Sequence, residues 1–248
     1  MIRWLVLALG LIAGAAGACP PPSETLLFHS CWGTAEAELV LLPEDALPAR
    51  GDATLVLLVS GAYTGTVARD GDRPNPVGLF VDGGRVVNPN LARMDGILIL
   101  PEDGPPELQH RTGVSFAGRR HDLRRPDERH AFARAAAAAG ASVLQSHLLI
   151  VDGLSDVAEQ PDAPSARRRV FFTGAQGWGV WQSAGPETLF TATAQLAAAH
   201  APRMAFNLDM GSFDYCWRGS RDRGLARCGV RGRDDLSRLS NLLALTLH

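Results

Sequence analysis

An acidic residue at the end of a short apolar run is the first candidate for chemistry in this chain. The run at residues 204–208 leads directly into Asp209, and the small residues Gly211 and Ser212 follow closely. An Ala-rich segment precedes the run, so the order predicts a helix, a turn, a strand and a loop that carries Asp209. Reactive side chains commonly lie on loops at strand ends. The alternative interpretation is an ordinary turn, which Asp and Gly both favour.

Three consecutive arginines, Arg167, Arg168 and Arg169, form the second candidate, because they lead into the apolar residues 170–173. A guanidinium can hold a phosphate or a carboxylate through two parallel hydrogen bonds. The alternative is a solvated arginine cluster, since every basic residue of the chain is Arg and Lys is absent. Without Lys, Schiff-base chemistry and a P-loop lysine are excluded.

The third candidate is the sequence Gln145, Ser146 and His147 at the entrance of an apolar run. Histidine can act as an acid or a base near neutral pH. A lone histidine beside an apolar run can equally form a hydrogen bond to the backbone. The sequence contains no nucleophile elbow, Walker loop or dinucleotide-binding glycine motif.

Helices are predicted at residues 126–139, where Gly140 would end the helix, at 186–200 with proline in the first turn, and at 234–245 as an amphipathic terminal helix. Short apolar runs between turn-forming residues predict strands. They lie at 26–31, 38–42, 54–60, 76–81, 96–100, 148–151 and 204–208, with hairpins around 82–84 and 174–177. These elements predict an α+β (mixed α/β) fold: a single domain with a mixed, largely buried sheet flanked by helices.

The chain has 248 residues, 46% of them hydrophobic, and a net charge of -2. This composition provides a substantial core and gives no sign of binding to nucleic acid. Residues 1–18 resemble a secretory signal: Arg3 precedes an apolar stretch and a small-residue cleavage site. We expect residues 19–248 to form one exported domain, periplasmic or secreted, without a membrane span after signal removal. A lipid anchor on Cys19 is the alternative.

The four cysteines, Cys19, Cys31, Cys216 and Cys228, all fall in the predicted exported part. An even number of cysteines in an oxidising compartment suggests two disulfides. The simplest connectivity pairs neighbours in sequence, Cys19 with Cys31 and Cys216 with Cys228. The spacing is unlike that of a zinc site.

Five short motifs stand in one order between about residues 26 and 217. They are residues 59–63 with 76–79, then 94–98, 145–153, 168–172 and 208–211. In that order they resemble the motifs of the phosphodiester glycosidase domain family, one of whose members removes N-acetylglucosamine from a phosphodiester. The family's Leu-Asp-Gly-Gly falls on Asp209, and the arginine that opens its Arg-x-x-x-Gly strand falls on Arg168.

The chain departs from the family at several of these positions. Val59 replaces an Asn, Asp95 replaces the Asn before a Gly, and His147 replaces a Gly-Pro pair with one residue fewer. Phe172 replaces a Gly, and Met210 replaces the first Gly after the acid. Because glycine lets the backbone approach a ligand closely, Met210 is expected to crowd that place.

The resemblance implies an exported hydrolase that cleaves a sugar-1-phosphodiester or a related envelope glycan linkage, such as one in an exopolysaccharide. Asp209 is the expected general acid/base and Arg168 the phosphate anchor, with Asp95 as partner carboxylate and His147 assisting proton transfer. Further substrate-binding candidates are Tyr63, Gln145, Ser146, Gly211 and Ser212. The expected ligand is a carbohydrate or sugar phosphate, and no metal or organic cofactor is implied.

A binding module of the same fold, without turnover, is the alternative function. Val59, Phe172 and Met210 favour it, because each replaces a small or polar family residue with a larger apolar one. Such a module would hold an envelope glycan or a protein partner. A disulfide-stabilised structural envelope protein without a ligand is a third interpretation.

Overall fold

The computed structural model describes residues 18–43, 54–65, 73–210, 213–220, 224–229 and 233–248. The predicted signal segment lies outside the described residues except for Ala18, and Gly211 and Ser212 lie outside them as well. The chain is mostly β-structure, with 42% strand and 16% helix. The described residues form four sheets and two α-helices.

Three large sheets make up most of the fold, and each joins segments that are distant in sequence. The first sheet has the order β1 (Leu26–His29), β14 (Gly177–Gln182), β13 (Arg169–Gly174), β15 (Met204–Asn207), β11 (Leu148–Val151) and β12 (Leu154–Ser155). The second has the order β5 (Arg85–Asn88), β4 (Phe80–Asp82), β10 (Ser142–Ser146), β6 (Gly96–Leu100) and β7 (Glu107–His110). The third has the order β17 (Gly224–Arg227), β16 (Cys216–Ser220), β3 (Leu55–Ser60), β18 (Asn241–Leu247) and β2 (Ala35–Leu41).

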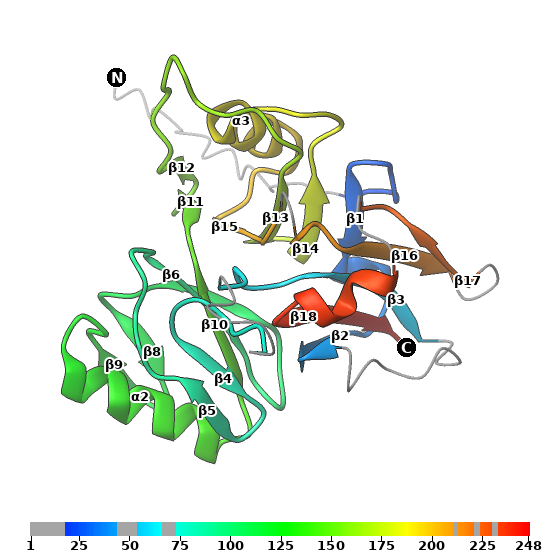
Figure 1. Ribbon diagram of the computed structural model, residues 1–248. Coiled ribbons are helices and arrows are strands. Elements are labelled where there is room, and N and C mark those ends of the chain that lie inside the picture. The colour runs from blue at the N-terminus through cyan, green and yellow to red at the C-terminus, as the bar shows by residue number, and fades with distance from the viewer. Residues whose placement is uncertain (1–17, 44–53, 66–72, 211–212, 221–223, 230–232) are drawn as a thin grey trace, which may run out of the picture.

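A small hairpin of β8 (Val114–Phe116) and β9 (Arg119–His121) is the fourth sheet. Helix α2 (Pro126–Ala138) packs Phe132 and Ala136 against β4, β6 and β10, and α3 (Leu189–His200) packs Ala192 and Leu196 against the first sheet. Figure 1 shows α2 and α3 on separate parts of the molecule. Short 3-10 turns lie at Ser30–Trp32 and Arg233–Arg238.

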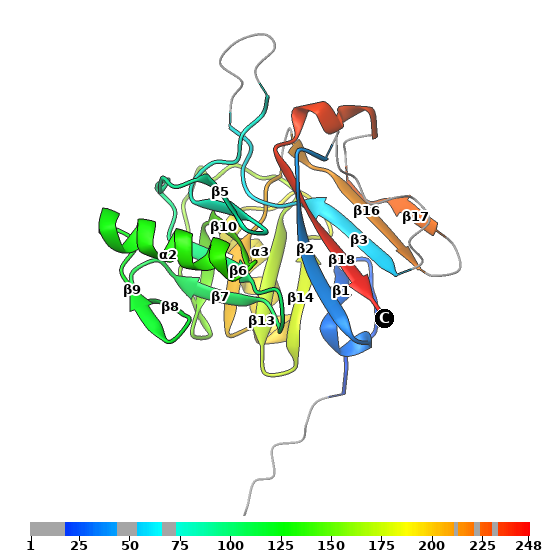
Figure 2. The same cartoon turned by 90° about the horizontal axis from the view of Figure 1, so that it is seen from below.

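One apolar core joins the three large sheets. Phe171 and Phe206 come from the first sheet, Leu98 from the second, and Leu57 and Leu243 from the third, and all five are buried in the same cluster. Figure 2 shows strands of all three sheets converging on the middle of the molecule. Burial of apolar surface between sheets therefore holds the strand ends of the three sheets at fixed positions relative to one another.

The predicted α+β fold with a mixed sheet is wrong. Every strand pairing among the described residues is antiparallel, and the strands divide among several sheets instead of forming one sheet flanked by helices. The helices predicted at 126–139 and 186–200 correspond to α2 and α3, and both predicted hairpins are present as β4–β5 and β13–β14.

The amphipathic helix predicted at 234–245 is also wrong. Its first part is the 3-10 turn Arg233–Arg238 and its second part is β18, which lies between β2 and β3 in the third sheet. Residues 241–245 are buried, because one face of the strand packs Leu243 and Leu245 in the core that joins the sheets and the other packs Leu242 and Ala244 in a second apolar cluster. Such a strand has a continuous apolar run, which periodicity alone does not separate from a buried helix.

Both disulfides pair as predicted, Cys19 with Cys31 and Cys216 with Cys228, with Cα–Cα distances of 5.9 and 4.9 Å. Each links residues 12 apart in sequence. No helix among the described residues is long and apolar enough to cross a membrane.

Candidate functional site

The loop that carries Asp209 lies where strands of the three sheets end. The backbone N–H of Asp209 donates to the carbonyl of Gly61, just after β3, at 2.9 Å. The N–H of Asn207 donates to the carbonyl of His147, between β10 and β11, at 2.9 Å. The N–H of Leu208 donates to the carbonyl of Arg169 at 3.0 Å. Backbone hydrogen bonds thus bring four of the sequence motifs together.

Asn241 fixes the loop after β3. Its Oδ1 accepts from the N–H of Ala62 at 2.8 Å, and its Nδ2 donates to the carbonyl of Ala62 at 3.1 Å. A Cβ on Gly61 would lie 2.4 Å from Oδ1 of Asn241, so a side chain at this position would displace the amide. Strand β18, which the sequence analysis took for a helix, therefore positions Tyr63 and Thr64.

Asp209 is almost completely buried and both of its carboxylate oxygens accept hydrogen bonds. The N–H of Thr64 donates to Oδ2 and the N–H of Met210 donates to Oδ1, each at 2.9 Å. Burial raises the pKa of Asp209 to about 6, an effect that outweighs these hydrogen bonds, which lower it, and the nearby Asp214 raises it further. Asp209 can therefore gain or lose a proton near neutral pH.

Tyr63 lies between the charged groups of the site. Its hydroxyl accepts a hydrogen bond from Nδ2 of Asn207, and its ring is 6.2 Å from that of His147 at an angle of 70°. Burial raises the pKa of the phenol, Asp209 adds to the rise, and Arg168 opposes it. Asp209 and Arg168 are therefore both close enough to Tyr63 to act on its charge. The phenol stays protonated at neutral pH and can donate to a ligand.

Two buried polar atoms beside Tyr63 lack a hydrogen-bond partner within the described residues, Oδ1 of Asn207 and Oγ of Ser146. The hydroxyl of Ser146 approaches that of Tyr63 closely enough to affect the pKa of the phenol. Leaving a buried polar atom unpaired costs about 1–3 kcal/mol. A water molecule or a ligand hydroxyl at this place would offset that cost.

Arg168 supplies a half-buried positive charge next to Tyr63. Its guanidinium donates to the carbonyl of Glu187 through Nε at 3.1 Å and to that of Pro164 through Nη2 at 2.6 Å. Its own N–H donates to the hydroxyl of Ser183 at 2.9 Å. None of the ion pairs formed by the described residues includes Arg168. Burial lowers its pKa, so a bound anion would stabilise its charged form.

The neighbouring Arg169 has a different environment. It is completely buried, and its Nη1 lies 2.9 Å from Oδ1 of Asp214. It also donates to the carbonyl of Tyr215 and to Oε1 of Gln182, each at 3.3 Å. Arg169 is therefore a link between β13 and the segment that leads into β16.

Gln145 and Asp95, both predicted site residues, interact with the backbone of the scaffold. Gln145 is completely buried, and its Oε1 accepts from the N–H groups of Leu79 at 3.0 Å and Ala92 at 2.9 Å. A Cβ on Gly78, which has φ of +83°, would lie 2.4 Å from this oxygen. Oδ1 of Asp95 accepts from the N–H of Leu148 at 2.9 Å, which fixes the junction between β10 and β11.

His147 is exposed and faces the ring of Tyr63, so the structure brings it to the Asp209 site together with Ser146. The predicted candidates Gly211 and Ser212 lie outside the described residues. The predicted residues in the described part of the candidate site are therefore Tyr63, Ser146, His147, Arg168 and Asp209.

Two of the departures from the family lie in the core. Val59 is completely buried in the cluster that joins the sheets, and Phe172 packs in the cluster beneath α3, with its ring 5.5 Å from that of His200. Met210 is only partly buried and adjoins Asp209, to which its N–H donates. Of these three apolar substitutions, Met210 alone directly follows the candidate acid.

Asn207 is a site residue that the sequence analysis missed. Side chains of a strand alternate between its faces, so residues 207 and 209 are expected on the same side. Counting back two residues from Asp209 along the predicted strand would therefore have identified Asn207 as a site residue. Thr64, which the sequence analysis also missed, contacts Asp209 through both its backbone N–H and its side chain.

No family model and no curated protein matches the sequence. Among solved structures, the chain is similar to the catalytic domain of zebrafish N-acetylglucosamine-1-phosphodiester alpha-N-acetylglucosaminidase, described as auto-inhibited by its pro-peptide. That match has 10% identity and a TM-score of 0.50, and covers 88% of this chain and 74% of the other. A hypothetical protein from Synechocystis matches with 13% identity and a TM-score of 0.42, covering 86% and 57%. The first similarity indicates a distant relationship of fold to a phosphodiester glycosidase catalytic domain.

Proposed function

We propose that the chain is an exported hydrolase of sugar-1-phosphodiesters or a related envelope glycan linkage, with its active site around Asp209. One observation carries the proposal: Asp209, a buried carboxyl group with a pKa of about 6, and Arg168, which pairs with no carboxylate among the described residues, both act on Tyr63. Such a combination suits a substrate that has both a reacting sugar carbon and a phosphate. The fold similarity is consistent with this chemistry.

Arg168 would hold the phosphate, because its guanidinium is oriented by two carbonyls and retains donors for an anion. Tyr63, Asn207 and Ser146 would bind sugar hydroxyls through the phenol and the two unpaired oxygens. His147, which is exposed beside Tyr63, would assist proton transfer at the solvent side.

The proposed reaction adds water across the bond between the anomeric carbon and the phosphate oxygen. That bond breaks, the water oxygen bonds to the anomeric carbon, and a free sugar and a phosphomonoester form. The departing phosphate is a weak base that Arg168 already stabilises, so it needs little protonation. The more demanding proton transfer is from the attacking water, and ionised Asp209 is the group proposed to accept it.

The alternative proposal is a glycan-binding or protein-binding module that has lost turnover, and Met210 is the observation that favours it. Met210 adds a side chain directly after Asp209, where the family has a Gly, whereas Tyr63, Asn207 and Arg168 would still bind a sugar phosphate. Both functions require that the site bind a sugar phosphate, but only the hydrolase cleaves it.

The test incubates the purified chain with N-acetylglucosamine-1-phosphodiesters and measures released sugar together with binding. Activity in the wild type that is lost in Asp209→Asn supports the hydrolase. The matched control is Asp152→Asn, because the Asp152 side chain is 70% exposed and pairs with the exposed Arg203 at the surface. Binding without release would favour the binding module, and equal activity in wild type and Asp209→Asn would contradict the catalytic assignment.

Export is part of the proposal, and the two disulfides are compatible with it. The Cys19–Cys31 bond uses the sulfur that a lipid anchor would need, which favours a soluble mature form over a lipoprotein. Mass spectrometry of the exported protein is expected to find a chain that starts at or near Cys19. An exported chain that retains Met1, or a lipid on Cys19, would contradict this prediction.

A further inference from the structure

A second feature with binding chemistry is a surface cavity of about 460 Å³, whose lining among the described residues includes no residue of the candidate site. It lies where the segment before β1, the end of β14 and the β16–β17 hairpin meet. Its charged lining residues are Arg167, Arg218, Arg227 and Glu24, and the others are Leu27, Gln182, Ala184, Cys228 and Gly229. The volume is within the range of small-molecule sites.

The cavity has an excess of positive charge. Three guanidinium groups line it against the single carboxylate of Glu24. Arg167 and Arg218 each donate one hydrogen bond to a backbone carbonyl, those of Ala184 and Ser23, and no ion pair given by the described residues involves any of the three arginines. Most of their donors therefore remain for a bound group, and an anion is the matching ligand.

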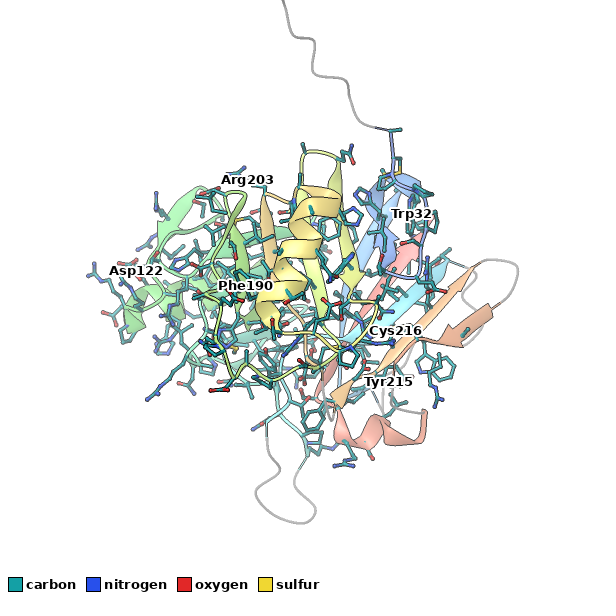
Figure 3. All side chains as sticks on the ribbon, turned by 90° about the horizontal axis from the view of Figure 1, so that it is seen from above. Trp32, Asp122, Phe190, Arg203, Tyr215 and Cys216 are labelled. Carbon is teal, nitrogen blue, oxygen red and sulfur yellow. A yellow bond between two sulfur atoms is a disulfide. The ribbon has the colours of Figure 1, made fainter. Side chains whose placement is uncertain are left out.

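The walls of the cavity are held in place by independent links. Cys228 on one wall is bonded to Cys216, and a Cβ on the adjacent Gly229 would lie 2.7 Å from the N of Cys216, so the chain is closely packed there. On the other wall, Gln182 accepts from Arg169 and donates to the carbonyl of Glu24, both at 3.3 Å. Figure 3 shows Tyr215 and Cys216 side by side, on the opposite side of the molecule from Asp122.

The cavity is also adjacent in sequence to the candidate active site. Arg167 lines the cavity, whereas the next residue, Arg168, acts on Tyr63. Consecutive Cα atoms are about 3.8 Å apart. The cavity and the Asp209 site are therefore connected through neighbouring residues of the segment that leads into β13.

We propose that this cavity binds a phosphate or carboxylate group of an anionic saccharide polymer, as a site separate from the Asp209 site. The anion is argued from the three arginines alone. That a saccharide bears this anionic group is inferred from the proposed function and from the amide and carbonyl groups of the lining, which can form hydrogen bonds with sugar hydroxyls. The described residues that line the cavity include no aromatic side chain and few apolar ones, unlike a site for apolar peptide side chains.

The test measures by calorimetry, at 150 mM salt, the binding of a uronic acid hexasaccharide, a neutral hexasaccharide and an inorganic polyphosphate of about six units. The Arg218→Gln/Arg227→Gln double variant is compared with Arg119→Gln/Arg134→Gln, which makes the same charge change on exposed residues of β9 and α2. We expect the first variant to weaken binding of the anionic hexasaccharide at least tenfold and the control less than twofold. The neutral hexasaccharide should bind to neither double variant.

Equal losses in the two double variants would overturn the site, since they would reflect net charge alone. Binding of polyphosphate without binding of the uronic acid hexasaccharide would overturn the saccharide carrier. If the double variant does not fold, as judged by its circular dichroism, the single variant Arg227→Gln at an exposed side chain replaces it. Hydrolysis of small sugar-1-phosphodiesters should be unchanged in all variants, so a failure of the proposed function leaves the binding result interpretable.

Discussion

The proton affinity of Asp209 is set by two opposing effects at one residue. Burial favours the neutral acid, and two backbone N–H donors favour the carboxylate. The effect of burial is the larger one, so the pKa of Asp209 rises from 3.8 to about 6. A carboxyl group of this kind is costly to the fold when ionised, which is typical of a residue retained for function.

The stability of the protein should therefore depend on pH through Asp209. The folded pKa lies above the unfolded value, so the stabilisation is complete below about pH 4 and is lost as the pH rises through 6. A shift of about two units corresponds to roughly 3 kcal/mol. Denaturant unfolding at pH 4.5 and pH 7 should show about 2 kcal/mol of this loss in the wild type and a smaller loss in Asp209→Asn. Asp152→Asn should show the same loss of unfolding free energy as the wild type.

The same pKa predicts the pH profile of hydrolysis. If Asp209 accepts a proton from water, kcat/KM should rise through about pH 6 to a plateau, because the ionised carboxylate is the active form. Asp209→Asn should lower kcat about 10²–10⁴-fold. A rate that instead falls through pH 6 would show that the protonated acid is the active form and would reverse the assigned role.

Arg168 should matter for binding more than its charge alone implies. Arg168→Lys keeps the charge and loses the planar donor arrangement, so we expect KM for a sugar-1-phosphodiester to rise about tenfold with a smaller change in kcat. Arg85→Lys is the matched control, because Arg85 is 68% exposed at its side chain. An unchanged KM in Arg168→Lys would contradict the role of phosphate anchor.

At the scale of elements, local signals predicted what local interactions determine. The β4–β5 hairpin and α2 were expected from an Asp-Gly-Gly turn and from a proline-led segment that Gly140 ends, and both are present. Strand β18 was not predicted from the sequence. It forms a strand because it pairs with β2 and β3, which are more than 180 residues away in sequence. Its apolar run is compatible with a helix until those partners are known.

The β16–β17 hairpin should depend on its disulfide. Cys216 pairs with Val59 of β3, and the bond to Cys228 closes a loop across the hairpin. A loop of this length is stabilised by about 2–4 kcal/mol. Cys216→Ser/Cys228→Ser should lower the free energy of unfolding by that amount. Cys19→Ser/Cys31→Ser, with the same sequence separation at the N-terminal side, measures the general effect of losing a disulfide.

For the whole molecule, the roles of the site residues remain predictions, whereas the predicted arrangement of the sheets was wrong. Asp209, Arg168, Tyr63, Ser146 and His147 were each expected from motifs, and the structure brings them together. The division into several antiparallel sheets was missed, since it follows from long-range pairings such as β13 with β15 and from a core shared between sheets. Individual strands do not specify which other strands they will pair with.

The ion pair of Arg169 and Asp214 gives a test of how the sheets are held together around the site. Arg169 is the first residue of β13 in the first sheet, and Asp214 precedes β16 in the third. Both side chains are almost fully buried, and Nη1 of Arg169 lies 2.9 Å from Oδ1 of Asp214. Removing one partner leaves the other charge buried, so Arg169→Met should cost about 3–5 kcal/mol of unfolding free energy. The double variant Arg169→Met/Asp214→Leu removes both charges and should recover a large part of that loss. A double variant as unstable as the sum of its single variants would show that the two residues act independently, and the pair would then be no link between the sheets.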